Sequence, residues 1–187
     1  MDVATAERQA LDAAEDLFYA RGIHTVGMDD IRAASGVSLK RLYQLFPAKD
    51  LLVAAFLQRR DIRWRQRLAD YVAGRPEPAE RLLAVFDWLF EWFSEPGYRG
   101  CAWINSFGEL GAVSATVVQE AQSHKQAFKR YLDGLVADAG LPGWLADHLL
   151  LLAEGAMVTA AIAGSPEPAR HAREAVRLLM RAAAIPR

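Results

Sequence analysis

Apolar side chains recur at helical spacing along nearly the whole chain, and this periodicity restricts the fold more than any other feature. The first such stripe consists of Leu11, Ala14, Leu17 and Phe18. These residues repeat every three or four positions, which is the spacing of one face of an α-helix. No segment shows a convincing alternation of apolar and polar residues with the period of two that a half-buried strand requires. The sequence therefore predicts an all-α fold.

Glycine and proline divide this pattern into about nine helices. Gly22 and Gly74 follow apolar stripes, where a helix commonly ends. Pro78 stands where the first turn of a new helix is expected, because proline is tolerated there. After the first helix, the predicted helices cover about residues 28–34, 38–45, 48–73, the stretch from Pro78 to Phe93, a short stretch after Gly100, then 115–139, 143–163 and 166–184.

The two short helices near the N-terminus are joined by a tight turn that contains Gly36. Two such helices with a short, glycine-containing turn form a helix-turn-helix, whose second helix places its N-terminal residues in the major groove of DNA. Lysine and arginine can donate to guanine, and glutamine can bridge adenine. We expect Val37, Leu42 and Phe46 to pack inward. The second helix offers DNA the side chains of Ser38, Lys40, Arg41 and Gln44, with Ser38 also a plausible N-cap.

Charge is distributed unevenly along the chain. The total is close to neutral, with 22 Lys+Arg against 23 Asp+Glu, so net charge alone predicts attraction neither to nucleic acid nor to a membrane. Between residues 32 and 67, however, nine basic residues face only two acidic ones, a local charge of +7. Such a field suits phosphate binding, although a solvated helix face can have the same composition.

Residues 8–55 resemble the TetR family of transcriptional regulators. The resemblance is carried by Ile31, Ser35-Gly36-Val37-Ser38, Leu42-Tyr43, Phe46-Pro47-Ala48-Lys49-Asp50 and Leu52. It implies a three-helix DNA-binding domain over residues 1–50 and a helical ligand-binding and dimerisation domain over residues 51–187. Beyond residue 60 it concerns the number and length of helices only. Most such proteins are repressors that a small molecule releases from a palindromic operator.

The resemblance assigns two further DNA contacts. Tyr43 matches the recognition-helix tyrosine that contacts a phosphate, and Lys49 matches the lysine at the start of the long helix that also meets the DNA backbone. The alternatives are core packing beside Phe46 for Tyr43 and an ordinary exposed position for Lys49.

Four positions depart from the family pattern. Gly27 replaces a Thr or Ser that caps the second helix and touches phosphate, so only a backbone N–H is left for that contact. Arg32 replaces a small residue, and its two alternative roles are a phosphate contact and an ordinary exposed side chain. Lys40 replaces a common glycine, which predicts unusual base readout. Leu45 replaces a His or an aromatic residue and receives no role in DNA binding.

Aromatic residues are concentrated in the second half of the chain, on helices that line the ligand cavity in the resembled family. Aromatic walls with few polar groups suit apolar, planar ligands. Core packing is the alternative for each aromatic residue, and a surface or satisfied core position for His124. Asn105 and Glu109 are further candidate polar groups. The predicted ligand-binding residues are Trp88, Trp92, Trp103, Phe107 and His124.

The helix at 143–163 is apolar around most of its circumference and rich in small residues, so it must be buried on more than one side. A second copy of the chain is the expected cover, because the resembled family builds its dimer from the last two helices. An intramolecular core helix is the alternative. The predicted interface comprises Leu149, Leu152, Ala153, Ala156, Met157, Ala160, Ala172, Val176 and Leu179.

Several other classes of protein are disfavoured. The single cysteine, Cys101, rules out an intramolecular disulfide and a CxxC pair, and no HExxH, GxSxG or P-loop motif indicates an enzyme. We expect no cofactor, no metal and no membrane span, and the first residues lack the pattern of a signal peptide. The predicted protein is a cytoplasmic, homodimeric regulator with double-stranded operator DNA and a small effector as partners. A helical ligand-binding protein without DNA binding is the alternative.

Overall fold

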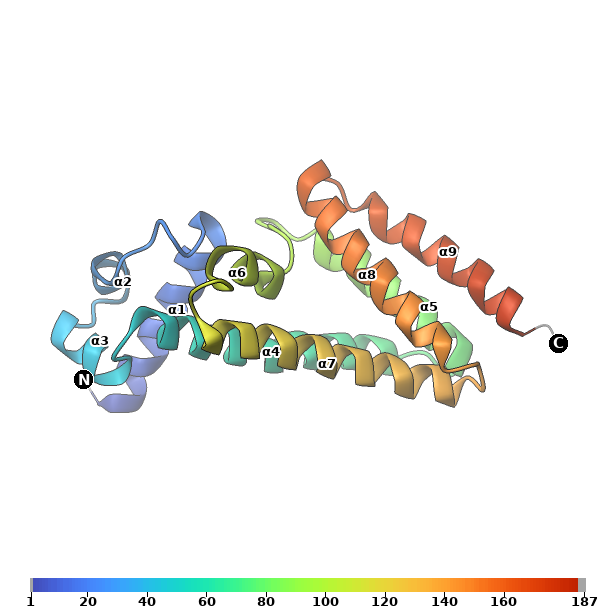
Figure 1. Ribbon diagram of the computed structural model, residues 1–187, viewed down its shortest axis with the longest axis horizontal. Helices are drawn as coiled ribbons and strands as arrows, with labels where there is room; N and C mark the ends of the chain where they lie inside the picture. Colours follow the sequence, from blue (N-terminus) through green and yellow to red (C-terminus); the bar gives the residue numbers. More distant parts are fainter. Residues whose placement is uncertain (1, 185–187) are drawn as a thin grey trace. The chain divides into compact units, whose positions relative to one another are not determined.

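The computed structural model describes residues 2–184, which form nine α-helices and no strand (Figure 1). This confirms the predicted all-α class. The helices are α1 (Val3–Arg21), α2 (Met28–Ser35), α3 (Leu39–Leu45), α4 (Lys49–Ala73), α5 (Pro78–Phe93), α6 (Ala102–Leu110), α7 (Ala115–Asp138), α8 (Trp144–Ala163) and α9 (Glu167–Ala183).

Local signals in the sequence set several of these helix ends. Ser38 is the N-cap of α3, and its hydroxyl accepts a hydrogen bond from the Arg41 N–H at 3.3 Å. Pro78 occupies the first turn of α5, where its missing N–H costs nothing. Gly36 ends α2 with a φ of 68°, a left-handed conformation that favours glycine because it has no Cβ. The predicted cap, turn and proline positions are confirmed.

The helices gather into two compact units, which we describe separately. The first contains the chain up to Ile62 together with Ala102–Ser123, and the second contains Arg63–Cys101 and the chain from His124 onward. The division therefore falls inside α4 and α7, and α6 is part of the unit that holds α1–α3. The functional boundary near residue 50 is a different kind of division and stays a prediction.

In the first unit, α1, α2 and α3 pack against one another. Ile31, Val37 and Leu42 are fully buried between them and Phe46 is nearly so, which confirms the inward positions expected for the last three. The Phe18 ring of α1 lies 6.0 Å from the Phe56 ring of α4. This core holds the short helix α3 in place, because a seven-residue helix is not stable in isolation.

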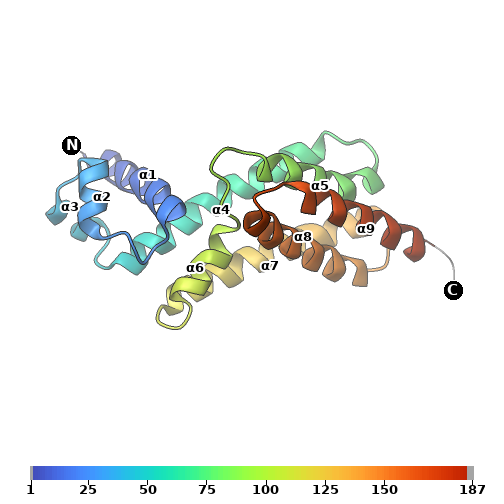
Figure 2. The ribbon, with the colours of Figure 1, turned by 90° about the horizontal axis from the view of Figure 1, so that it is seen from above.

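In the second unit, α8 packs against both α5 and α9, and α9 also packs against α5; the three helices lie side by side in Figures 1 and 2. Ala146, Ala153 and Ala160 of α8 are buried at the contacts. An ion pair between Arg173 Nε and Asp87 Oδ1, at 2.6 Å, ties α9 to α5. Part of the apolar surface of α8 is thus used within the protomer.

Candidate nucleic-acid interface

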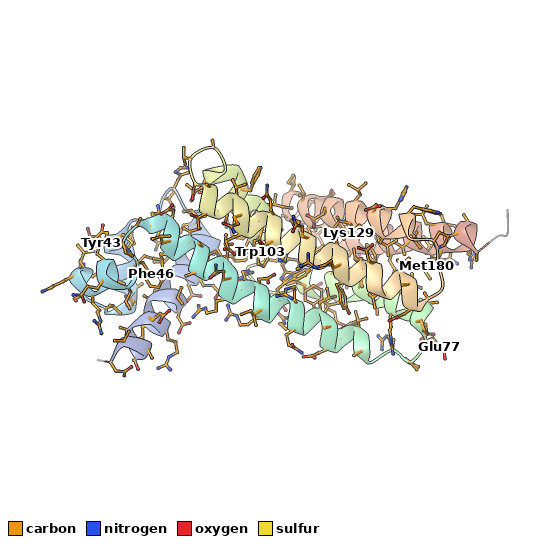
Figure 3. The ribbon with its side chains drawn as sticks, turned by 60° about the horizontal axis from the view of Figure 1, so that its bottom comes forward. Tyr43, Phe46, Glu77, Trp103, Lys129 and Met180 are labelled. Atoms are coloured by element: carbon orange, nitrogen blue, oxygen red, sulfur yellow. The ribbon has the colours of Figure 1, made fainter. Side chains whose placement is uncertain are left out.

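The recognition helix α3 turns its polar side chains outward. Lys40, Tyr43 and Gln44 are exposed, and Tyr43 has 48% of its surface accessible to solvent. Figure 3 labels Tyr43 on α3 and Phe46 just after it; the first is open to solvent and the second is buried. Core packing beside Phe46 therefore does not describe Tyr43, and its phenol is available to a phosphate.

Two side chains of α3 contact each other across one turn. Arg41 Nη1 donates to Gln44 Oε1 at 3.2 Å, a spacing of three residues that places both side chains on one face of the helix. This contact uses the glutamine carbonyl and leaves the Gln44 amide N–H groups and other guanidinium N–H groups free to meet base edges. Ser38 is exposed, as predicted, and its hydroxyl also caps the start of α3.

Lys49, the first residue of α4, is bound more closely to the protein than the other predicted DNA contacts. It is half-buried, and its Nζ donates to the Ile23 carbonyl at 2.5 Å. Burial lowers the pKa of Lys49, and the charges of Glu109 and Asp30 offset part of that effect. Its phosphate contact stays a prediction, but Lys49 is not an ordinary exposed lysine.

At the start of α2 the structure differs from the expectation for Gly27. The Gly27 N–H donates to Asp30 Oδ2 at 2.7 Å, so a side chain of the protein already occupies the N–H that was left for a phosphate. Arg32, three residues after Asp29, pairs with it at 3.1 Å on the surface. The Gly27 N–H is therefore occupied within the protein, whereas Arg32 uses only its Nε for Asp29 and stays exposed.

The charge of +7 expected over residues 32–67 is reduced by ion pairs. Arg59 pairs with Asp12 at 2.7 Å and with Glu15 at 3.0 Å, and Arg60 pairs with Glu15 at 2.9 Å. These arginines connect α4 to α1 within the first unit. The sequence window therefore overstates the positive field, because the carboxylates that pair with Arg59 and Arg60 lie outside it.

Trp64 is the centre of an aromatic cluster in the second unit and was not among the predicted residues. Its ring centroid lies 5.1 Å from Trp88, 5.6 Å from Trp92, 5.0 Å from His124 and 5.3 Å from Phe128. Trp64 and His124 are both buried. Three of the predicted ligand-binding residues are thus brought together around a tryptophan of α4.

The other two predicted ligand-binding residues lie on α6, in the first unit. Trp103 is buried, whereas Phe107 has 52% of its surface exposed. Glu109, a candidate polar group of the ligand cavity, instead accepts a hydrogen bond from the His24 N–H at 2.8 Å. The proposed cavity therefore loses Glu109, and the roles of Trp103 and Phe107 stay predictions.

The predicted dimer residues divide into two groups. Leu152 and Leu179 are half-buried and line an apolar groove of about 550 Å³ between α8 and α9. Seven others are buried inside the protomer, which leaves them almost no surface for a partner; these are Leu149, Ala153, Ala156, Met157, Ala160, Ala172 and Val176. Their burial favours the core-helix alternative for that face of α8.

A different set of apolar side chains on the last two helices is open to solvent. Leu151 is 71% exposed, Ile162 84% and Leu178 56%, and Val158 is also exposed. Leu151 and Leu178 line the same groove as Leu152 and Leu179. An uncovered apolar face of this kind marks a site of association, so the candidate interface shifts to these residues.

Comparison with known proteins agrees with the helix-turn-helix. Residues 10–56 match the family model described as bacterial regulatory proteins, tetR family. An HTH-type transcriptional regulator from Mycobacterium tuberculosis is 38% identical over 78 residues, covering 42% of this chain and 39% of the relative. The HTH-type transcriptional activator FasR from Mycolicibacterium smegmatis is 34% identical over 93 residues, covering 49% of this chain and 42% of the relative. The alignments thus span about two fifths of each relative.

Solved structures extend the similarity to nearly the full chain. A TetR-family transcriptional regulator from Streptomyces coelicolor superposes with a TM-score of 0.87 at 28% identity, covering 97% of both chains. A putative TetR transcriptional regulator from Streptomyces avermitilis gives 0.84 at 28% identity, covering 97% of this chain and 99% of the other. The helix-turn-helix segment thus matches the TetR family of bacterial regulatory proteins in sequence, and the architecture of the whole chain matches that of a TetR-family transcriptional regulator.

Proposed function

We propose that this protein is a sequence-specific DNA-binding transcriptional regulator, which binds a palindromic operator as a homodimer through one α3 helix per half-site. The observation that carries the proposal is the outward face of α3. Lys40, Tyr43 and Gln44 are exposed on a helix that the fully buried Leu42 anchors to the core. A fixed helix with exposed polar side chains on its free face is what readout in the major groove requires.

The side chains divide by the chemistry they offer DNA. Lys40, Arg41 and Gln44 have the donors that read guanine and adenine edges. The Tyr43 hydroxyl and the Lys49 ammonium suit phosphate oxygens, which fix the position of the protein but do not specify a base. The hydrogen bond between Arg41 and Gln44 supports joint reading of neighbouring bases by these two residues.

The second copy covers the exposed apolar face of α8 and α9. Leu151, Ile162 and Leu178 supply apolar surface, and the groove between the two helices accepts side chains of a symmetric partner.

Among the described helices, α8 is long and apolar enough to cross a membrane. Its packing against α5 and α9 supports a core and dimer helix instead, and operator DNA places the protein in the cytoplasm.

The effector is a largely apolar, ring-containing small molecule that binds at the aromatic cluster around Trp64. The rings of Trp88 and Trp92 stack at 5.5 Å and meet Trp64 edge-on. All three rings are buried, so a planar ligand would bind by separating them and replacing their ring contacts with its own. Release from DNA requires that the ligand bind one conformation of the protein better than the other. We propose that the protein represses transcription and that this ligand relieves the repression. Because the relative FasR is described as an activator, the transcription assay must be able to detect an increase as well as a decrease.

The central test is footprinting on the DNA upstream of the protein's own gene. We expect two protected half-sites related by a two-fold axis, with centres about 34–36 Å apart or a multiple of one helical turn. Lys49→Ala and Tyr43→Phe should weaken binding equally on all sequences. Protection of a single asymmetric half-site would contradict the dimer, and no preference over random DNA would contradict the proposed function.

A further inference from the structure

The loop between α1 and α2, residues 22–27, is held by side chains from three helices of the first unit. Asp30 of α2 accepts from the Gly27 N–H, and Lys49 of α4 donates to the Ile23 carbonyl. The third is Glu109 of α6, which is 85 positions away from His24 in the sequence. The loop leads into α2, so these contacts fix where the helix-turn-helix begins.

Glu109 makes the most extensive of these contacts. Its Oε2 accepts from the His24 N–H at 2.8 Å, and its backbone carbonyl accepts from His24 Nε2, also at 2.8 Å. The same carboxylate lies over Gly22, where a Cβ would come within 3.3 Å of Oε1. Side chain and backbone of one residue thus hold two positions of the loop.

Lys49 couples this contact to DNA binding. Its Nζ donates a hydrogen bond to the Ile23 carbonyl, and Ile23 lies between Gly22 and His24, the two residues next to the Glu109 carboxylate. The carboxylates of Glu109 and Asp30 are the charged groups that favour the ammonium form of Lys49 against the effect of burial. Glu109 therefore influences both the position and the charge of a predicted phosphate contact.

We propose that Glu109 is a positioning residue for DNA binding, which holds loop 22–27 and thereby fixes Lys49 and the start of α2 in the DNA-binding arrangement. The inference rests on the proposed function. A second contact, from Ser114 Oγ to Asp50 Oδ2 at 3.3 Å, ties the segment after α6 to the residue next to Lys49. Loss of Glu109 should therefore loosen the loop without unfolding the unit.

The test compares three variants of the full chain. Glu109→Ala removes the acceptor for the His24 N–H, and Glu109→Gln keeps an acceptor but removes the charge. Glu120→Ala is the matched control, because it breaks another surface hydrogen bond of the same unit, with Gln58 at 2.7 Å, away from the loop. Operator affinity is measured by fluorescence anisotropy, and hydrogen exchange of the His24 amide is measured by NMR.

We expect Glu109→Ala to weaken operator binding about tenfold, close to the lower limit for loss of a hydrogen bond to a charged group, and to speed exchange at His24 by at least a similar factor. Glu109→Gln should recover most of the affinity at neutral pH, and Glu120→Ala should match the wild type. In a double-mutant cycle, Glu109→Ala should cost little more once Lys49→Ala is present, because both act on the same contact. A general structural defect would add to Lys49→Ala.

Wild-type operator affinity and unchanged His24 exchange in Glu109→Ala would overturn the inference. Equal losses in Glu109→Gln and Glu109→Ala would overturn the role of the hydrogen bond, and full additivity with Lys49→Ala would overturn the coupling. Failure of the wild-type protein to bind any operator is a separate result, which contradicts the proposed function instead.

Discussion

Replacing one exposed leucine of α8 should dissociate the dimer without unfolding the protomer. Leu151 has 71% of its surface accessible in the protomer, so most of its side chain would be buried only by a partner. Full burial of a leucine contributes about 1.5–3 kcal/mol. Leu151→Ala should therefore cost about 1–2 kcal/mol per protomer.

The symmetry of the dimer doubles this effect, because the same residue is lost on both sides of the interface. The total is about 2–4 kcal/mol, which corresponds to a dimer dissociation constant raised by about 30- to 700-fold. This increase in the dissociation constant applies to a leucine at the centre of the interface, and a leucine at its rim would give a smaller one. Sedimentation equilibrium over a concentration series measures the constant directly.

Two controls separate the interface from general effects. Val113→Ala removes an apolar side chain that is 79% exposed on the first unit, and it should leave the dissociation constant unchanged. Leu149→Ala, two positions from Leu151 but fully buried, should instead lower the free energy of unfolding by about 2–5 kcal/mol. A wild-type dissociation constant for Leu151→Ala would refute the assignment of this face.

Three further predictions concern the core, base readout and pH. Trp64→Ala should lower the free energy of unfolding by about 3–5 kcal/mol, because the buried Trp64 contacts four other rings; urea denaturation measures this, with the partly exposed Trp144 as the control position. Lys40→Ala or Arg41→Ala should relax base preference at particular operator positions, by about 1–3 kcal/mol per bidentate contact, and a binding-site selection profile identical to the wild type would contradict their role. Burial lowers the pKa of Lys49 below 10.5, so its charge is present below that lowered pKa and is lost as pH rises through it. Operator affinity at constant ionic strength should therefore fall on the alkaline side before 10.5, and Lys49→Ala should remove that part of the pH dependence.

The positions of the helices could be predicted because their signals are local. Ser38 caps α3 by contacting a residue three positions away, and Pro78 begins α5 by virtue of its own ring. Such interactions depend only on the nearest turn of chain, so they can be recognised without knowing the tertiary contacts. The exposure of α3 followed as well, since burying Val37, Leu42 and Phe46 directs the polar residues between them outward.

The free face of α8 could not be predicted because the sequence there is nearly uniform. Leu149 is fully buried and Leu151 is 71% exposed, yet both belong to one run of four leucines. Residue type therefore carries no information about which side meets α5 and α9. Only the packing of the three helices separates the core positions from the surface positions.

Trp64 and Glu109 were missed or misplaced for different reasons. Trp64 stands between Arg63 and Arg65, which makes its segment resemble a solvated face, although its spacing from Leu68 and Val72 follows the helical period and was a usable signal. Glu109 meets a loop 85 positions away, and nothing in its own neighbourhood encodes that contact. Periodicity predicts burial, whereas long-range polar contacts require the fold.

The ion pairs in the structure predict how strongly salt should weaken operator binding. Of the nine basic residues in the charged window, Arg59 and Arg60 are held by carboxylates of α1, and Arg32 is paired with Asp29. The predicted DNA-binding residues retain three cations per protomer, Lys40, Arg41 and Lys49. If all of them displace counterions, a dimer neutralises about six phosphates, and log K against log salt concentration has a slope of about −5. Lys40 and Arg41 are directed at bases and displace fewer counterions than phosphate contacts do, so a slope shallower than about −5 also agrees with the assignment. A measured slope steeper than about −10 would require cations beyond these three, such as the paired arginines, to meet phosphates, and it would contradict this interface.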